Sequence, residues 1–381
     1  MSPATAARAA LSGPADLLVR SPGRINIIGE HTDYTGGLVL PASIDKALYF
    51  AVRRTGAPEL RLTALDIDER ATLPLPLTGR GDRTWVNYLT GIGIQFQDQG
   101  HFLPGLEIAF GGDLPQGAGM SSSAALEGGM AFLLNEVLNA GLDRPALAAL
   151  CKRSSNTFMG IPSGIMDQFA SLNGRAGGPI LLNCHTLAYE PVVDKIAGYE
   201  LLLINSMVSH NLGESEYPLR VAECARALEA IQRQFPEVTH LSAATEAQLA
   251  AVREQLDVTA YRRAGYVIAE NHRVRRAINA MESGSPTELG TLLNATHAGL
   301  RDNYEVSCAE IDFIQARAVE HPGVAGARLL GGGFGGCVLV LVEAGAGGAA
   351  GEEVLAHYGR TFGIEGEWYA VRFAGGTSLT E

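Results

Sequence analysis

Short apolar runs separated by glycine and proline predict β-strands in the first part of the chain. These runs lie at Leu17–Val19, Ile25–Ile28 and Ala47–Val52. Aliphatic clusters bounded by turn-forming residues are typical of strands. A further run at Leu106–Phe110 predicts another strand, which leads into the glycine-rich segment 111–119. The N-terminal part of the chain is therefore expected to contain a β-sheet.

A helical pattern begins where that glycine-rich segment ends. From Ser122 onward, apolar residues recur at spacings of three and four, at positions 126, 130, 133, 134 and 137, which predicts a helix with a buried face. Further helices are predicted at about Pro218–Phe235 and Tyr261–Met281. The arginines of the last segment are expected to form a solvated face.

Three later apolar runs predict strands at Ile180–Leu182, Glu200–Ile204 and Cys337–Val342. Strands and helices alternate irregularly along the chain, which favours an α+β fold over a regular doubly wound sheet. The segment 191–198 is the best candidate for a domain boundary. The sequence thus predicts an N-terminal α+β domain at residues 1–190 and a C-terminal α+β domain at residues 191–381.

Composition fits a globular protein and limits its partners. Hydrophobic residues make up 46% of the 381 residues and charged residues 18%, enough for a sizeable core. The formal charge, 29 minus 41, is −12, which argues against a nucleic-acid partner because such proteins carry a basic face. Lysine occurs only at Lys46, Lys152 and Lys195. An anionic ligand would therefore depend on backbone N–H groups and arginine.

The sequence also argues against a membrane partner and a disulfide framework. No apolar run reaches the roughly 18 residues of a membrane span, and the alanine-rich start lacks the apolar core of a signal peptide. The five cysteines are widely spaced, with no CxxC pair, so free thiols in a reducing compartment are expected. We therefore expect a cytoplasmic protein, whose oligomeric state the sequence does not define.

Residues 21–37 gather charged and polar side chains in a short stretch. Within ten residues lie Arg24, Glu30, His31 and Asp33, among glycines that let the backbone turn tightly. Each carboxylate can accept several hydrogen bonds, so the cluster suits a ligand with adjacent hydroxyl groups. A polar surface turn is the alternative.

Residues 114–125 combine glycines with three serines at the predicted start of a helix. Such a segment leaves several N–H groups unpaired beside the positive end of the helix dipole, which favours phosphate binding. The GxxxxGK[ST] pattern of a P-loop is absent, and no Gly-Lys dipeptide occurs in the chain. An ordinary helix cap would explain one serine but hardly three.

Residues 331–336 formally satisfy the GxGxxG pattern. A dinucleotide-binding fingerprint requires a strand before the glycines and a helix after them. Here a strand is predicted to follow, so we reject that interpretation. A glycine loop near a nucleotide and a simple tight turn both remain open.

A fourth segment, residues 160–171, places Asp167 in an apolar, glycine-containing stretch. A lone carboxylate is costly to bury without a partner, and a nearby arginine would keep it ionised. The alternative is a structural cap.

Together these segments resemble the galactokinases, which belong to the kinase superfamily shared with homoserine, mevalonate and phosphomevalonate kinases. Residues 23–41 resemble the long galactokinase signature nearly residue for residue. The resemblance then continues through 114–125, 160–171, 205–224, 300–307 and 326–337, so it covers almost the whole chain. It implies two α+β domains with the active site in the cleft between them.

The resemblance also implies roles for individual residues. Arg24 and Asp167 would be the catalytic pair. The sugar would be held by Glu30, His31, Asp33, Gly164 and Tyr217. The ATP phosphates would be wrapped by Gly117, Ala118, Gly119, Met120, Ser121, Ser122 and Ser123, with Ser123 also on Mg²⁺. Trp85 resembles the residue of the family that lies near adenine.

The sequence departs from the family pattern at the metal site. Ser155 stands where the family usually has a glutamate as second Mg²⁺ ligand, and a neutral hydroxyl is a poorer partner for a hard cation. Ser163 replaces a frequent cysteine, and Leu329–Leu330 replace the usual Met-Thr pair. These changes affect metal and nucleotide binding more than sugar binding.

The resemblance implies ATP- and Mg²⁺-dependent phosphorylation of D-galactose to galactose 1-phosphate, by direct in-line transfer. Two alternatives remain. One is the same reaction on a related sugar, L-arabinose or N-acetylgalactosamine. The other is a non-catalytic regulator that binds sugar and ATP, which Ser155 favours and the intact Arg24, Asp167 and Ser121–Ser123 disfavour. A serine hydrolase is the least favoured alternative, because Gly-x-Ser-x-Gly is absent and no histidine is tied to the serine run.

Overall fold

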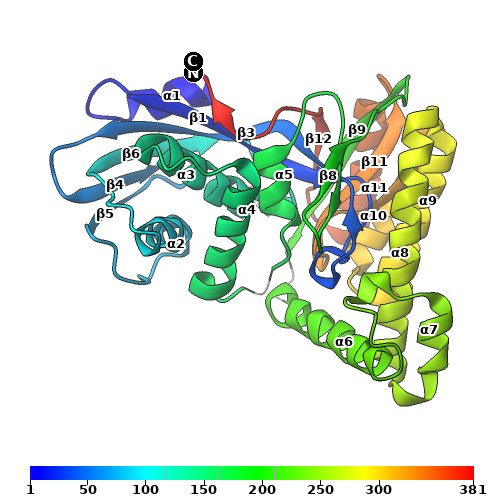
Figure 1. Ribbon diagram of the computed structural model, residues 1–381. Coiled ribbons are helices and arrows are strands. Elements are labelled where there is room, and N and C mark those ends of the chain that lie inside the picture. The colour runs from blue at the N-terminus through cyan, green and yellow to red at the C-terminus, as the bar shows by residue number, and fades with distance from the viewer. Residues whose placement is uncertain (116, 162, 210–211) are drawn as a thin grey trace.

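The computed structural model describes residues 1–115, 117–161, 163–209 and 212–381, leaving aside the side chains of 209 and 212–215. Mixed helices and sheets form two lobes (Figure 1). The α+β class expected from the irregular alternation of strands and helices is confirmed.

The first lobe is built on a six-stranded sheet in the order β13-β1-β3-β6-β4-β5. Its strands are β1 (Leu17–Asn26), β3 (Pro41–Arg54), β4 (Glu59–Ala64), β5 (Glu69–Pro74), β6 (Leu106–Gly112) and β13 (Ser378–Leu379). Only β4 and β6 pair in parallel. The chain's last strand thus pairs with its first.

Alternation along the strands gives this sheet two buried faces. Phe50 and Val52 of β3 enter the main core, whereas Ala51 between them packs under helix α1 (Pro3–Ala9). The main-core face is covered by helices (Figure 1), which are α2 (Thr84–Asp98), α3 (Ser122–Leu138), α4 (Arg144–Arg153) and α5 (Met166–Asn173).

Strand β1 differs in one respect from the prediction. The two predicted pieces, Leu17–Val19 and Ile25–Ile28, are largely joined in a single strand. The pairing register with β3 shifts between Pro22 and Arg24. A bulge of this kind absorbs a residue that cannot donate to the ladder and re-aims its neighbours. It sets the course of the chain just before Arg24.

The second lobe contains a four-stranded antiparallel sheet in the order β10-β11-β9-β12. The strands are β9 (Tyr199–Ser209), β10 (Val324–Leu329), β11 (Gly335–Glu343) and β12 (Glu367–Val371). The helices of this lobe are α6 (Leu212–Gln234), α7 (Glu246–Ala251), α8 (Val258–Ser283), α9 (Pro286–Gly299), α10 (Ala309–Glu320) and α11 (Gly347–Phe362).

The second sheet divides its residues between two cores. Leu203 of β9 joins the core of the first lobe, whereas Leu202 and Ile204 join the core of the second. This explains why the strand is apolar at successive positions rather than at alternate ones. A small third sheet of β2 (Leu38–Val39), β7 (Ile180–Asn183) and β8 (Tyr189–Pro191) completes the fold. The division at residue 190 stays a prediction.

Two expectations about the helices of the second lobe are wrong. Helix α6 begins at Leu212, so Pro218 lies inside it rather than at its start. The arginines of α8 do not all form a solvated face. Arg263 is only 2% exposed, because it pairs with Glu223 and Glu305. In the described parts of the chain, no helix is long and apolar enough to span a bilayer.

Candidate active site

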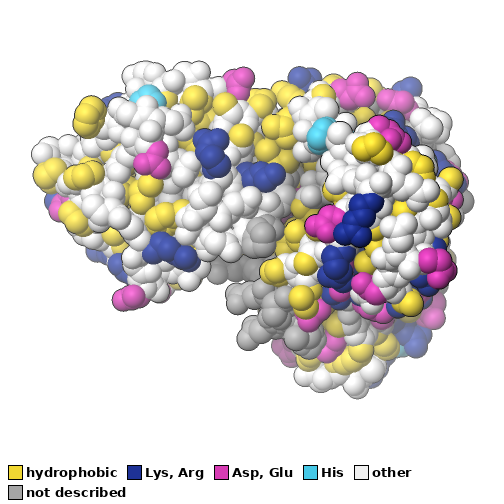
Figure 2. Space-filling model, turned by 60° about the horizontal axis from the view of Figure 1, so that its bottom comes forward, with side chains coloured by type: hydrophobic (Ala, Val, Ile, Leu, Met, Phe, Trp, Pro, Cys, Tyr) yellow, Lys and Arg dark blue, Asp and Glu magenta, His cyan; other side chains and the backbone are white. Residues whose placement is uncertain are grey.

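A cavity of about 680 Å³ lies between the two lobes. Side chains from the first lobe and the glycines that connect β10 to β11 share its wall. Among the predicted residues, it is lined by Arg24, Glu30, His31, Asp33, Ser123, Ser155, Gly164, Asp167 and Tyr217. The space-filling view shows the molecule indented between its lobes (Figure 2). The structure therefore brings together segments that are far apart in the sequence.

Arg24 and Asp167 form a bidentate ion pair at this cavity. Nε of Arg24 donates to Oδ1 of Asp167 and Nη2 to Oδ2, both at 2.8 Å. Burial alone would lower the pKa of Arg24, but the charge and hydrogen bonds of Asp167 raise it above its usual value. The Asp167 side chain remains 34% exposed, so it can still reach a ligand.

Ser121 completes this pair. Its hydroxyl donates to Oδ2 of Asp167 at 2.5 Å, and Nη1 of Arg24 donates to the carbonyl of Gly119 at 2.6 Å. Ser121 has a left-handed backbone, with φ of 57°. The predicted phosphate segment and the predicted catalytic pair are thus one hydrogen-bonded unit.

Glu30 is tied to the second lobe by a fully buried ion pair. Oε1 accepts hydrogen bonds from Nη1 of Arg328 at 2.7 Å and from N–H of Gly331 at 2.9 Å, and Oε2 accepts one from Asn26 at 2.8 Å. Arg328 is 0% exposed and also donates to the carbonyl of Ile27. Glu30 therefore holds the glycine loop against the segment 26–33, in addition to lining the cavity.

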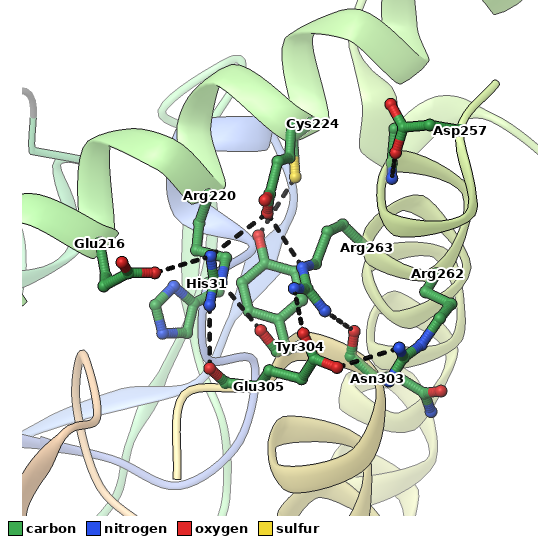
Figure 3. Close-up of polar contacts among 12 residues, drawn as sticks. His31, Glu216, Arg220, Cys224, Asp257, Arg262, Arg263, Asn303, Tyr304 and Glu305 are labelled. Carbon is green, nitrogen blue, oxygen red and sulfur yellow. Dashed lines mark hydrogen bonds and ion pairs between the residues drawn. The ribbon is translucent and has the colours of Figure 1, made fainter.

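His31 ends a chain of hydrogen bonds that reaches into the second lobe. Its Nε2 lies 3.2 Å from the carbonyl of Gly332, and its Nδ1 lies 2.9 Å from the hydroxyl of Tyr34. The Tyr34 hydroxyl meets that of Tyr304 at 2.7 Å, and Tyr304 meets Sγ of Cys224 at 3.1 Å. Figure 3 shows His31 beside Tyr304 and Cys224.

The direction of donation along these hydrogen bonds follows from the groups at the His31 end. Burial lowers the pKa of His31 to about 4, so the imidazole is neutral near pH 7. A carbonyl can only accept, so Nε2 carries the proton and Nδ1 accepts from Tyr34. Both ring nitrogens are therefore engaged, and a sugar hydroxyl would compete with Gly332 for His31.

Arginines hold the tyrosine end of this chain in place (Figure 3). Arg220 donates to the backbone carbonyls of Tyr304 and Glu305, each at 2.9 Å. Arg263 bridges Glu223 at 2.9 Å and Glu305 at 2.6 Å. The turn that carries Tyr304 is thereby fixed against α6 and α8.

Asp33, Gly164 and Tyr217 lie together at the cavity. A Cβ at Gly164 would lie 1.6 Å from Oδ2 of Asp33, so only glycine leaves room for that carboxylate. Burial, followed by the charge of Asp167, raises the pKa of Asp33 to about 7. The Tyr217 ring lies 5.7 Å from that of His31, centroid to centroid. These residues form the side of the cavity nearest the segment 30–33.

The predicted phosphate segment runs into α3. Gly117 and Gly119 have φ of 71° and 69°, while Ala118 and Met120 are buried and anchor the loop. No side chain of the described residues caps the start of α3. Because the first N–H groups of a helix need partners, this end can accept an anion. Ser122 and Ser123 lie in its first turn.

Trp85 lies at a second cavity of about 420 Å³, beside the first. Thr84, Tyr88 and Ser123 line both cavities. The Trp85 indole donates to Glu69 at 2.6 Å, and its ring lies 5.8 Å from that of Phe110. This apolar pocket is well placed for a planar ring attached to phosphates at the start of α3.

Ser155 is buried beside a carboxylate that the sequence analysis overlooked. It lies in a π-helical segment, Ser154–Met159, and its hydroxyl donates to Oε1 of Glu127 at 2.7 Å. Gln168 donates to Oε2 of Glu127 at 3.1 Å. Burial raises the pKa of Glu127 to about 7. Position gave one clue, because Glu127 follows Ser123 by four residues and interrupts an apolar helix face.

The glycine segment 331–336 connects two strands of one hairpin, β10 and β11. A strand therefore follows the glycines, as predicted. Gly331, Gly332 and Gly333 line the main cavity. A Cβ at Gly333 would lie 2.2 Å from the carbonyl of Val306, so this turn requires glycine there.

Two residues that fix this region, Arg328 and Tyr304, were also missed by the sequence-based prediction, because only the fold places them near residue 30.

No group of three or more His, Cys, Asp or Glu side chains that could hold a metal occurs among the described residues. A cation at this site would therefore bind at most two carboxylates, together with hydroxyl and amide oxygens and oxygens of its ligand. That donor set suits a hard cation such as Mg²⁺. All five cysteines are free thiols.

Three comparisons with known proteins give a consistent result. Residues 9–54 match the galactokinase galactose-binding signature, residues 87–175 the N-terminal domain of GHMP kinases, and residues 276–360 their C-terminal domain. The chain is 37% identical to the galactokinase of Roseiflexus sp. over 86% of this chain and 83% of that protein. It is also 37% identical to the galactokinase of Homo sapiens, over 91% and 88%.

Solved structures agree with these relatives. The Lactococcus lactis galactokinase complexed with galactose superposes with a TM-score of 0.92 at 32% identity, covering 96% of each chain. The Methanococcus jannaschii mevalonate kinase matches with a TM-score of 0.66 at 16% identity, covering 96% of this chain and all of that one. The latter similarity shows a shared fold.

Proposed function

The chain belongs to the galactokinase family, and we propose that it transfers the γ-phosphoryl group of ATP to the anomeric hydroxyl of D-galactose. The observation that carries this proposal is the Arg24–Asp167 pair, joined by two hydrogen bonds of 2.8 Å. The pair lies in a cavity between the segment 30–33 and the uncapped start of α3. A hydroxyl and a phosphate could therefore meet at Asp167.

The proposed transfer is a direct in-line displacement. The anomeric oxygen forms a bond to the γ-phosphorus while the bond from that phosphorus to the bridging oxygen of ADP breaks. The hydroxyl proton passes to the exposed carboxylate of Asp167. Arg24 serves as counter-ion and stabilises charge on the transferred oxygens. Phosphoryl transfer depends on such positioning and electrostatics, and it needs no covalent nucleophile.

The phosphate side of the site would be built from residues 117–123. Their N–H groups would wrap the phosphates, and Trp85 would lie near adenine in the second cavity. Mg²⁺ would bind Ser123 and, when bound, would neutralise charge on the phosphate oxygens. Gln168 supports this fit, because its buried Oε1 has no hydrogen-bond partner among the described residues.

The sugar side would be built from Glu30, His31, Asp33, Gly164 and Tyr217. Asp33 offers a carboxylate, and Gly164 leaves room for it. Glu30 and His31 shape the pocket as well as contact the sugar, since their polar atoms already bind the second lobe. The free cysteines suit a reducing compartment, and we place the protein in the cytoplasm.

The test is ADP release from the purified protein with MgATP and galactose, glucose, L-arabinose or N-acetylgalactosamine, against a blank without sugar. We expect turnover on galactose alone. Turnover on another sugar instead would keep the reaction and change the substrate. No turnover, with galactose and ATP both binding by calorimetry, would replace the enzyme by the regulator that Ser155 favours.

A further inference from the structure

Glu127 is a buried carboxylate that lacks a positive partner. It lies on α3 and forms part of the cavity wall, yet it is only 1% exposed. Its two hydrogen-bond donors, Ser155 and Gln168, are neutral. In the part of the chain that the structure describes, no Lys or Arg forms an ion pair with it. Burying a carboxylate in this way is costly unless a cation compensates it.

Gln168 supplies an independent observation at the same place. It is 5% exposed, lines the cavity and directs its amide nitrogen to Glu127 and Ser155. Its carbonyl oxygen Oε1 is buried without a hydrogen-bond partner among the described residues. A buried acceptor without a donor calls for an explanation, and an absent ion is one of them.

Four oxygen-bearing side chains converge here from three elements. Ser123 lies on the same face of α3, one turn before Glu127. Ser155 comes from the segment that follows α4, and Gln168 from α5, directly after Asp167. Hydroxyl, carboxylate and amide oxygens are the ligands that Mg²⁺ accepts, usually with one or two carboxylates, water and substrate phosphates.

We propose that Glu127 is the protein's carboxylate ligand for the divalent cation that accompanies the nucleotide, with Gln168 beside it. This inference rests on the proposed function, because that function brings a metal–nucleotide complex to the start of α3. A purely structural role would link α3 to its neighbours through two hydrogen bonds. A glutamine could keep these two links if the Gln168 amide turned so that its oxygen accepted, so hydrogen bonding alone does not require a carboxylate here.

The test is a titration with Mn²⁺, followed by electron paramagnetic resonance, in the presence of a non-hydrolysable ATP analogue and without sugar. The variants are Glu127→Gln, Glu127→Gln with Ser155→Glu, and Glu136→Gln as matched control on the same helix outside the cavity. We expect Glu127→Gln to weaken Mn²⁺ binding at least about tenfold. Adding Ser155→Glu returns a carboxylate at a position whose hydroxyl lies 2.7 Å from Oε1 of Glu127, and it should restore affinity to within about threefold.

Two results would overturn the proposal. One is Mn²⁺ affinity in Glu127→Gln within twofold of the parent and of Glu136→Gln. The other is a loss that Ser155→Glu does not restore, or that comes with a lowered melting temperature, since either would show a structural role. The titration needs no turnover. A Glu127-dependent Mn²⁺ site in a protein that phosphorylates no sugar would therefore uphold the metal site and reject the proposed function.

Discussion

The two sides of the interdomain cavity are built differently. On the side of residues 30–33, Glu30 already binds Arg328 and His31 already binds Tyr34 and Gly332, while Asp33 lines the cavity. On the side of residues 117–127, the start of α3 has no side-chain cap and Glu127 has no cationic partner within the described chain. The first side is held mainly by bonds within the protein, whereas the second leaves the first N–H groups of α3 and the Glu127 carboxylate without a capping side chain or a cation among the described residues.

This difference matches the chemistry of the two proposed substrates. A neutral sugar is only weakly attracted by distant charges, so its binding depends on a rigid pocket whose hydrogen-bonding groups are already oriented. A metal–nucleotide complex carries both negative and positive charge. Its phosphates can accept hydrogen bonds from the N–H groups at the start of α3, and its cation can bind the carboxylate of Glu127. Variants on the sugar side should therefore change stability and sugar affinity, whereas variants on the phosphate side should change ion binding and turnover.

The largest effect is expected at Asp167, where the two sides meet. Asp167→Asn keeps the shape but removes the charge that pairs with Arg24 and accepts the proton. We expect kcat to fall by about 10²–10⁴-fold, while galactose binding stays measurable by calorimetry. Asp98→Asn, at an exposed position on α2, is the control. Near-normal turnover of Asp167→Asn would remove Asp167 from the mechanism.

The next effect concerns the buried pair that fixes the sugar side. Arg328→Met leaves Glu30 buried without its cation, so we expect the free energy of unfolding to fall by about 3–5 kcal/mol. The exposed pair of Arg276 with Glu288, 60% and 41% exposed, provides the comparison. Arg276→Met should cost at most about 1 kcal/mol. Urea denaturation measures both, and equal losses would contradict the account.

A smaller effect is expected from the titration of Asp33. With its pKa raised to about 7, Asp33 becomes protonated as the pH falls below 7 and no longer accepts from a sugar hydroxyl as a carboxylate. Galactose should therefore bind about tenfold more weakly at pH 6 than at pH 8. His31 does not contribute, because its pKa of about 4 lies below this range.

The variant Asp33→Asn separates this titration from other groups. Its galactose affinity should be lower than that of the parent at pH 8 and nearly independent of pH from 6 to 8. Calorimetry of both proteins in matched buffers measures it. An unchanged pH dependence in Asp33→Asn would assign the titration to another group.

The smallest effect is expected at Tyr304. Tyr304→Phe removes one hydroxyl from the chain that orients His31, which corresponds to about 1 kcal/mol. We expect KM for galactose to rise about fivefold with kcat within twofold of the parent. Tyr261→Phe, whose ring stacks on Arg253 instead, should leave both unchanged. A drop in kcat without a change in KM would show that the chain acts on the transfer step.

The sequence predicted many of the residues that line this site, but it missed the residues that hold them in place. The reason is physical. Periodicity located α3 and an apolar run located β6. The cost of burying a lone carboxylate left two interpretations of Asp167, an ionised group beside an arginine or a structural cap. The resemblance supplied the partner as Arg24. Arg328 and Tyr304 carry no local signal, because their importance comes from neighbours up to 302 residues away. Glu127 carries only its position on an otherwise apolar helix face, four residues after Ser123. The prediction for Arg263 was wrong because the sequence pattern of an arginine on a polar helix face is the same whether the side chain contacts water or two glutamates.

The most direct test of the central claim is the ³¹P spectrum of the product formed from galactose and MgATP. The account predicts a new phosphomonoester signal, split by coupling to the anomeric proton, that grows in step with ADP. A signal coupled to the protons at carbon 6, or ADP formed without any sugar phosphate, would contradict it.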